Sequence, residues 1–334
     1  MQQQVITFLR ARPHNRWITH TDITPLNKAP SSANTNRSEP ERSSRPPSLA
    51  PVALLATLRG INKVLHLPSQ GKLLISAEMH GNGEDLRRLC AAFESLSRNE
   101  PETHWVILGD AVHGPSPEAA KKNQRLYGYQ DESWAIIEGI MSAQERHPGR
   151  VHFLIGNHDY GHIGGYHTSK FYDDEVEHLE ATLTEEQLQR LHEFLRGAMI
   201  AAIAPCGAFL AHGAPEACIE DLGDLERITL PAQDHKSRTI LRSLITSYGQ
   251  PKETAERFLQ TASTPELEVR FMIHGHDKDE AGFFFEGENQ LCPVLFGAPD
   301  ENKRVVLLDL SVQYESAMAL RDGIEILRLY SLGD

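Results

Sequence analysis

The sequence predicts an α/β protein in which short buried strands alternate with amphipathic helices. Three apolar runs, Lys72–Ser76, His104–Leu108 and Val151–Ile155, have the length and composition of buried strands. Helical periodicity precedes the second and third runs, and this alternation is typical of βαβ units in a largely parallel sheet. Ligands of such sheets bind at the carboxyl ends of the strands. The residues that follow each run are therefore the first candidates for a functional site.

Apolar residues spaced three and four apart predict helices over residues 83–96 and 132–146. Thr184 has the position of an N-cap for a further helix, and residues 234–263 predict two more, separated near Gly249-Gln250-Pro251. The C-terminal third is dense in strands. We expect one earlier strand at Ala208–Ala211. Five more are expected in the C-terminal third, at Val269–Ile273, Phe283–Glu286, Leu291–Phe296, Val305–Leu310 and Ile324–Tyr330.

The N-terminal stretch has a different composition from the rest. From about Thr19 to Pro51 it is rich in Ser, Pro, Asn, Thr and Arg and holds few large apolar residues. Such a segment cannot bury enough surface to offset its ordering entropy. We therefore expect a mostly disordered tail over residues 1–51 and one folded domain over residues 52–334. Within that domain, Ala53–Leu65 is expected to form a helix or a packed approach to the sheet.

Composition excludes several classes of function. The net charge is −13, and residues 1–50 hold seven basic and three acidic residues, so the body is strongly acidic. This charge disfavours non-specific nucleic-acid binding. No run has the apolar length that crosses a membrane, and Met1–Gln4 lacks the basic start of a signal peptide. The four cysteines show no close pairing pattern, which favours a reducing, cytoplasmic location.

Metal-ligand side chains recur beside glycines at the ends of the expected strands. Glu78 and His80 follow the first strand, Asp110 the second, and Asn157 the third. Two late positions, His212 and the His274-Gly275-His276 pair, add imidazoles. Singly, most of these motifs are compatible with ordinary turns or packed loop histidines. In this order, oxygen and nitrogen ligands at strand ends indicate a two-metal hydrolytic site that acts on phosphate esters.

Chemistry suggests a role for each residue. One carboxylate must bridge both cations, and Asp110 is the natural candidate. Glu78 and His80 are expected on the first cation. Asn157, His212 and His276 are expected on the second. His158 lies beside a ligand but is expected to point to the leaving group as a general acid.

These motifs resemble those of the calcineurin-like metallophosphoesterase superfamily, most closely its Ser/Thr phosphoprotein phosphatase branch. Ala77–Gly81, Gly109–Val112 and Gly156–Asp159 are similar to the family's first three motifs, and His212-Gly213 to the fourth. The region from His276 to Pro299 resembles the family's last histidine, aromatic strand and Ser-Ala-Pro turn. The resemblance covers roughly residues 70–330.

The resemblance implies a central β-sandwich flanked by helices on both faces, with a two-metal site at one edge. It implies two divalent ions, Mn or alternatively Fe or Zn, and water as the nucleophile. His158 and Asp159 are expected among the catalytic residues. His276 is the expected ligand, and His274 is a secondary candidate because both histidines bind metal in other branches.

The departures from the family pattern concern substrate binding. Glu78 stands where the family has aspartate, and His113-Gly114 replaces an Asp-Arg pair that orients the catalytic histidine and binds phosphate. Ile155 replaces another arginine. His113 could contact phosphate, replace the lost hydrogen-bond partner, or be a loop residue without a role. Four residues could bind phosphate in place of the missing arginines, and the sequence leaves the choice open: Arg125, Arg227, Arg238 and Lys170.

Three functions remain open at this stage. The first is a phosphatase acting on a phosphorylated protein or another small phosphomonoester. The second is a phosphodiesterase or nucleotide hydrolase that uses the same cations. The third is a binding module with a degenerate phosphatase fold. The segment 160–183 either forms the substrate rim or caps the sheet. Neither a nucleic-acid nor a membrane partner is expected.

Overall fold

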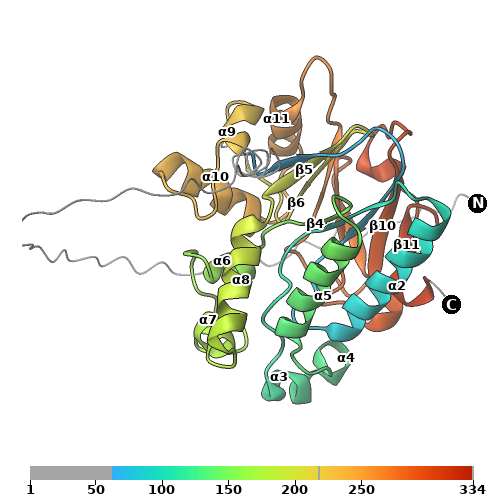
Figure 1. Cartoon of the computed structure of the whole chain (residues 1–334). Helices are drawn as coiled ribbons and strands as arrows, with labels where there is room; N and C mark the ends of the chain where they lie inside the picture. Colours follow the sequence, from blue (N-terminus) through green and yellow to red (C-terminus); the bar gives the residue numbers. More distant parts are fainter. Residues whose placement is uncertain (1–61, 217–218, 333–334) are drawn as a thin grey trace, which may run out of the picture. The chain divides into compact units, whose positions relative to one another are not determined.

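The computed structural model describes residues 62–216 and 219–332, and these form two packed β-sheets with helices outside them (Figure 1). The predicted tail over residues 1–51 lies outside the described residues, as does most of Ala53–Leu65. The last residues of that range differ from the prediction, because Val64–His66 forms strand β1. Its three residues pair in parallel with β5, starting with Val64 opposite Ala201.

The first sheet contains the three strands predicted from the N-terminal half. In spatial order it runs β11 (Ile326–Arg328), β10 (Arg304–Asp309), β2 (Lys72–Ser76), β3 (His104–Ile107) and β4 (Val151–Phe153). β2, β3 and β4 are parallel neighbours, as predicted. β10 and β11 are antiparallel, with Val306 opposite Ile75 of β2. The sheet is therefore mixed, and the expectation of largely parallel pairing holds only for its N-terminal half.

The second sheet is built mainly from the C-terminal half. Its order is β1, β5 (Ala201–Ala204), β6 (Ala208–Ala211), β7 (Phe271–His274), β9 (Gln290–Pro293) and β8 (Phe283–Glu286). β6, β7 and β9 are parallel, whereas β5 and β8 are antiparallel to their inner neighbours. Parallel strands in each sheet thus send their carboxyl ends toward a common edge.

Alternating side chains fill three apolar layers. Leu73 and Ile75 of β2 join the cluster between the two sheets, and Leu210 of β6 meets them from the other sheet. Leu74, with the opposite orientation, packs with the outer helices. On the other outer face, the Phe209 ring of β6 lies 4.7 Å from that of Phe258. Successive side chains of a strand point to opposite faces of the sheet, and in a sandwich covered by helices both of these faces are buried.

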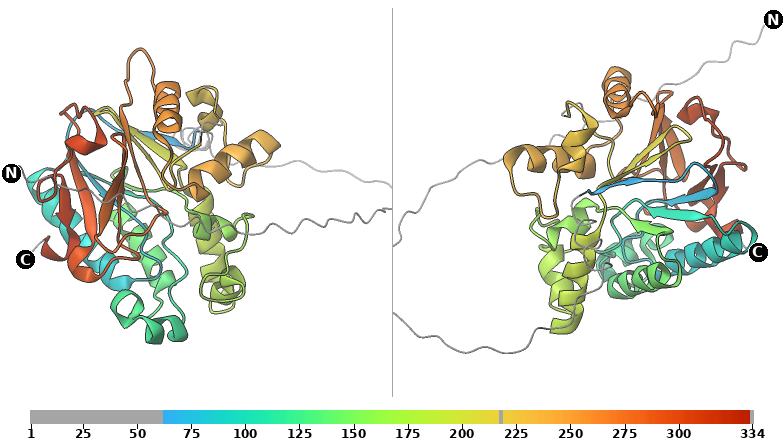
Figure 2. Two further views of the ribbon diagram at one scale, coloured as in Figure 1. Left: turned by 180° about the vertical axis from the view of Figure 1, so that it is seen from behind. Right: turned by 45° about the horizontal axis from the view of Figure 1, so that its top comes forward.

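Helices cover both outer faces. Figure 2 shows α2 and α5 on one side of the sandwich and α10 and α11 on the other, which confirms the predicted β-sandwich with flanking helices. The longer helices are α2 (Gly83–Asn99), α5 (Ser133–Arg146), α8 (Glu185–Gly197), α10 (His235–Thr246) and α11 (Lys252–Ala262). The short ones are α3 (Pro117–Lys122), α4 (Gln124–Tyr127), α6 (Asn157–Gly161), α7 (Glu175–Glu180) and α9 (Leu222–Glu226). No described helix is long and apolar enough to span a membrane.

Local capping explains where two of these helices begin. The Thr184 side chain accepts from the Gln187 N–H, and the Gln187 side chain accepts from the Thr184 N–H, which confirms the predicted capping box of α8. Asn82 caps α2 by accepting from the N–H groups of Glu84 and Asp85. This cap also fixes the chain just after the first ligand motif, and so positions His80.

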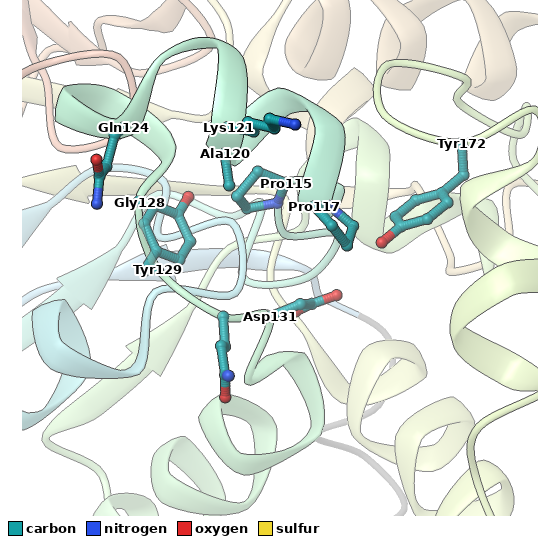
Figure 3. Close-up of a pocket in the computed structure, with 10 residues that line it drawn as sticks. Pro115, Pro117, Ala120, Lys121, Gln124, Gly128, Tyr129, Asp131 and Tyr172 are labelled. Atoms are coloured by element: carbon teal, nitrogen blue, oxygen red, sulfur yellow. The ribbon is translucent and has the colours of Figure 1, made fainter.

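A pocket of about 580 Å³ opens between α3, α4 and the segment that leads to α7. Tyr129 and Tyr172 lie on either side of Pro115 and Pro117 (Figure 3). The Tyr129 hydroxyl donates to the His80 carbonyl at 3.1 Å. The pocket therefore adjoins the backbone of the first ligand motif.

Candidate metal centre

The strand ends bring the predicted ligands together at one edge of the sandwich. Glu78 and His80 follow β2, Asp110 follows β3, and Asn157 begins α6 after β4. His212 directly follows β6, and His276 lies two residues beyond β7. Because β2, β3 and β4 of one sheet and β6 and β7 of the other are parallel, their following loops meet at this edge.

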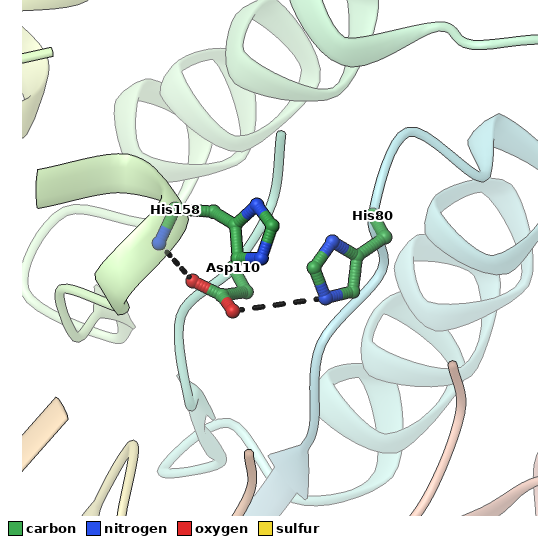
Figure 4. A group of neighbouring side chains, drawn as sticks. All are labelled: His80, Asp110 and His158. Atoms are coloured by element: carbon green, nitrogen blue, oxygen red, sulfur yellow. Dashed lines mark hydrogen bonds and ion pairs between the residues drawn. The ribbon is translucent and has the colours of Figure 1, made fainter. Parts of the chain in front are cut away.

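The first group of ligand atoms comes from His80, Asp110 and His158 (Figure 4). These atoms lie within 4.8 Å of one another. His80 Nε2 is 3.6 Å from Asp110 Oδ2, and Asp110 Oδ1 accepts from the His158 backbone N–H at 2.8 Å. The His158 ring stands nearly perpendicular to that of His80, with centroids 4.6 Å apart.

The second group shares Asp110 and adds His212 and His276. His212 Nε2 lies 3.3 Å from Asp110 Oδ2 and 3.2 Å from His276 Nδ1. The Asn157 amide oxygen lies 3.1 Å from His212 Nε2, 3.0 Å from His276 Nδ1 and 3.2 Å from Asp110 Oδ2. Asp110 is thus the residue common to both groups, which is the position that a bridging carboxylate needs.

The hydrogen bonds of these groups fit divalent cations. His212 Nδ1 lies 2.7 Å from the Leu108 carbonyl, and His80 Nδ1 lies 3.2 Å from the Val112 carbonyl. A carbonyl only accepts, so each Nδ1 carries a proton, and each Nε2 faces Asp110, where it could offer a lone pair to a cation. Lone pairs of imidazole, amide and carboxylate that face one point repel one another unless a cation lies among them. The donor set suits borderline divalent ions.

The ionisable groups are strongly coupled. Burial alone would raise the pKa of Asp110, but the imidazoles of His212 and His158 outweigh it and hold that pKa well below its usual value. Burial lowers the pKa of His212, yet the Asp110 carboxylate raises it to about 9. A buried carboxylate demands a positive charge beside it. Cations would take the place of the His212 proton.

Backbone strain is concentrated at this centre. Within the described part of the chain, the non-glycine residues with positive φ are His80 (43°), Asp110 (47°), His113 (69°) and His276 (68°). This conformation costs energy for residues with a side chain, and it persists where the surrounding structure enforces it. Gly109 (φ 91°) permits the turn before Asp110, because a Cβ there would lie 2.6 Å from the Gly156 nitrogen.

Asp159 stabilises the two loops that carry Asp110 and Asn157. Its carboxylate accepts from the N–H groups of Asp110 at 2.6 Å, Ala111 at 3.0 Å and Gly156 at 2.9 Å. Burial raises the pKa of Asp159 to about 7, although these donors favour the ionised form. Both oxygens of Asp159 are thus bonded to the backbone, and its place among the catalytic residues stays a prediction.

Glu78 and His274 lie beside the ligand groups without joining them. The Glu78 carboxylate accepts from the His276 N–H, and burial raises its pKa to about 8. His274 Nδ1 lies 2.9 Å from the Gly275 carbonyl, and its buried Nε2 has no hydrogen-bond partner among the described residues. The structure thus brings His276, and not His274, into the ligand group. Glu78 contacts the backbone of that histidine.

The far side of the His158 ring meets the candidate His113 and two residues, Thr168 and Glu175, that sequence reasoning missed. His158 Nδ1 lies 3.0 Å from His113 Nδ1, 3.1 Å from Thr168 Oγ1 and 3.4 Å from Glu175 Oε2. Glu175 comes from α7 and is buried, and its Oε1 accepts from the Phe171 N–H. The segment 160–183 therefore contacts the centre directly. Its motif Thr168–Glu175 carries no sequence signal that would link it to Gly156–Asp159.

A row of polar contacts continues from His113 to the helices α7 and α8. His113 Nε2 lies 3.0 Å from His162 Nε2, and His162 Nδ1 lies 2.9 Å from Glu180 Oε1. His192 of α8 contacts the same oxygen at 3.1 Å. Burial lowers the pKa of His113 to about 2, so this ring is neutral. A chain of neutral histidines that ends on a carboxylate fixes the tautomer of each ring.

Of the four candidate substitutes for the missing arginines, one lies at the centre. Arg125 forms an ion pair with Glu301 at 2.7 Å, Arg227 with Asp224 at 2.6 Å, and Arg238 donates to the Gln233 carbonyl. Lys170, by contrast, extends over the ring of Phe296, at 4.0 Å from its centroid.

Lys170 has a neighbour of like charge at the centre. The Phe296 ring packs against His80 at 4.1 Å, and the ammonium group of Lys278 lies 4.7 Å from its centroid. Although Lys170 is exposed as a residue, its ammonium end is surrounded by protein. This burial and the charge of Lys278 hold the pKa of Lys170 well below its usual value.

Comparison with known proteins agrees with this geometry. The family model of calcineurin-like phosphoesterases matches residues 71–279. The chain belongs to this family. It is accordingly a phosphoric ester hydrolase of the metallophosphoesterase class. No curated protein sequence matches the chain.

One solved structure shares the fold at low identity, and two further ones are less similar. A protein serine/threonine phosphatase from Saccharomyces cerevisiae, described as similar to human phosphatase PP5, has a TM-score of 0.53 at 15% identity, covering 77% of this chain and 80% of that one. A cold-active protein-tyrosine phosphatase of a psychrophilic Shewanella has a TM-score of 0.48 at 14% identity, with 75% and 78% covered. A putative diadenosine tetraphosphatase has a TM-score of 0.41 at 14% identity, with 74% and 92% covered.

Proposed function

We propose that this protein is a phosphomonoesterase of the Ser/Thr-phosphatase type, acting on a phosphorylated protein or a small phosphoester. The observation that carries the proposal is the sharing of Asp110 between two ligand groups, with the His158 ring beside them. Two divalent cations, Mn or alternatively Fe or Zn, would supply Lewis-acid charge to the phosphoryl oxygens and acidify the attacking water. His80 and Asp110 would hold one of them, together with Glu78. Asp110, Asn157, His212 and His276 would hold the other.

The protein's own residues then handle the leaving group. His158 donates a proton from Nε2 to the departing oxygen. Its Nδ1 side is fixed by His113, Thr168 and Glu175, so the ring is held in one orientation. His113 thus fits the hydrogen-bond role left open by the sequence, since its Nδ1 faces His158. Asp159 keeps the Asp110 and Asn157 loops together through the backbone.

The pocket beside the centre supports a substrate whose alcohol part is large enough to occupy it. Pro115 lies two residues beyond His113, and Tyr172 lies two residues beyond Lys170, so the pocket is adjacent in the chain to both sides of the centre. Its mixed proline and tyrosine lining suits a peptide or an aromatic alcohol. A cytoplasmic location, where cysteines remain reduced, is part of the same proposal. Cys90, Cys206 and Cys292 are free thiols in the structure.

Metal content and hydrolysis test this proposal together. The purified full chain is loaded with Mn²⁺, its bound metal is counted by mass spectrometry, and p-nitrophenyl phosphate and bis-p-nitrophenyl phosphate are offered as substrates. We expect two ions per chain and hydrolysis of the monoester. Fewer than one ion per chain with no hydrolysis of either ester would sink the proposal and leave a binding module.

A further inference from the structure

The two lysines over Phe296 come from distant parts of the chain and meet beside the centre. Lys170 lies in the segment before α7, and Lys278 lies just after the last ligand motif. Their ammonium groups approach one phenyl ring, at 4.0 and 4.7 Å from its centroid. That ring also contacts the ligand His80 at 4.1 Å. Phe296 thus joins both charges to the first ligand group.

Two neighbouring ammonium groups repel each other, and the described residues give them no carboxylate ion pair. Cation–π contact with Phe296 offsets part of this cost. The nearby carboxylates of Glu78 and Asp110 belong to the centre, where cations would neutralise them. The arrangement therefore lacks an anion. Without one, burial and the charge of Lys278 hold the pKa of Lys170 well below its usual value, and a bound dianion would stabilise its ammonium form.

We propose that Lys170 and Lys278 bind the phosphoryl group of the substrate and select phosphomonoester dianions over diester monoanions. The inference rests on the proposed function and names its substrate class. A monoester above its second ionisation carries two negative charges, and a diester carries one. Two ammonium groups attract the dianion about twice as strongly at the same distance.

The pair also explains how this chain dispenses with the two arginines that the resemblance led us to expect. Arginine grips phosphate through a fixed planar fork, whereas lysine acts as a compact point charge on a flexible stem. Phe296 restrains both stems by packing beneath their charged ends. The shared aromatic ring thus orients the two lysines, whereas an arginine is oriented by the planar shape of its own guanidinium group.

Three variants and two ligands test the pair. Lys170→Met and Lys278→Met remove one charge each while keeping an apolar stem over Phe296, and Lys122→Met removes an exposed charge of α3 as the control. Inorganic phosphate is titrated calorimetrically into each Mn²⁺-loaded chain. The value of kcat/KM is measured on p-nitrophenyl phosphate and on bis-p-nitrophenyl phosphate.

We expect each site variant to weaken phosphate binding and to lower kcat/KM on the monoester by about 10- to 100-fold, the range for a lost hydrogen bond to a charged group. The value on the diester should change by about threefold or less, and the bound metal should remain at two ions. Equal losses on both esters, or unchanged phosphate affinity, would overturn the inference. If the wild-type chain hydrolyses neither ester, the proposed function fails, but phosphate affinity still decides whether the lysines bind phosphate.

Discussion

Two regions of this molecule meet at the centre and hold their residues in different ways. The strand-end loops fix His80, Asp110 and His276 by backbone constraint, with positive φ angles and N–H bonds to Asp159. The segment 160–183 has backbone hydrogen bonds of its own, and it meets the centre through the side chains of Thr168, Lys170 and Glu175. In the proposed function, the first region binds the cations, and the second contacts the general acid and the phosphoryl group. Metal binding and turnover should therefore be separable by mutation.

The largest effect is expected in the strand-end region. Asp110→Asn removes the carboxylate shared by both ligand groups, and the amide cannot neutralise two cations. We expect a loss of kcat by more than about 10⁴-fold, comparable to removal of a metal's contribution to the transition state, together with loss of bound metal. Mass spectrometry and p-nitrophenyl phosphate hydrolysis measure both. Asp173→Asn, at an exposed position, is the control, and two ions retained in Asp110→Asn would contradict the bridging role.

His158→Asn changes the residue that contacts both the strand-end region and the segment 160–183. Loss of the general acid should lower kcat by about 10²- to 10⁴-fold while two ions stay bound, because Asp110, Asn157, His212 and His276 are untouched. The loss should be greater for phenyl phosphate than for p-nitrophenyl phosphate, whose leaving group needs no proton. His235→Asn, exposed on α10, is the control. If His158→Asn strips the metals, the residue is a ligand and not the acid.

Glu78→Gln tests the candidate ligand of the strand-end region that lies outside both groups of neighbouring ligand atoms. The amide keeps an oxygen that can accept from the His276 N–H but removes the negative charge. We expect metal affinity at one of the two positions to fall by about 10- to 100-fold, with activity restored by excess Mn²⁺. A titration of activity against free Mn²⁺ measures this. An unchanged titration curve would show that Glu78 supports the His276 backbone and holds no cation.

Glu175→Gln is expected to have the smallest effect of the four, and it acts through the segment 160–183. The amide keeps the shape of the side chain but weakens the charged contact with His158 Nδ1. We expect kcat on phenyl phosphate to fall by about tenfold, equivalent to a change of about one unit in the pKa of His158 when the buried charge 3.4 Å from its Nδ1 is removed, with the metal content unchanged. Glu177→Gln, exposed on the same helix, is the control. A loss of folded protein on thermal melting, with kcat per folded chain unaltered, would make Glu175 merely structural.

Sequence reasoning found the strands and the ligands because both are local. β2, β3 and β6 were expected within a residue or so of where they lie, since an apolar run followed by glycine marks a strand end. Asp110, Asn157 and His212 lie within four residues of such ends. What was missed is non-local. Glu175 lies 17 residues after His158 in the sequence, on the next helix, and contacts its ring. Lys278 lies 108 residues after Lys170, and the ammonium groups of both lysines lie over the Phe296 ring.

By itself, the sequence determined the order of strands and the kinds of ligand that follow them, because local apolar patterning sets where a strand ends. It determined the family as well, since those ligands stand in a specific order. Only the tertiary structure decided which strands belong to which sheet, and that Asp159 bonds to backbone. It also decided that Lys170, Lys278 and Glu175 lie beside the candidate ligands. Long side chains can reach a site from many positions, so which of them meet depends on the packing of segments far apart in the chain.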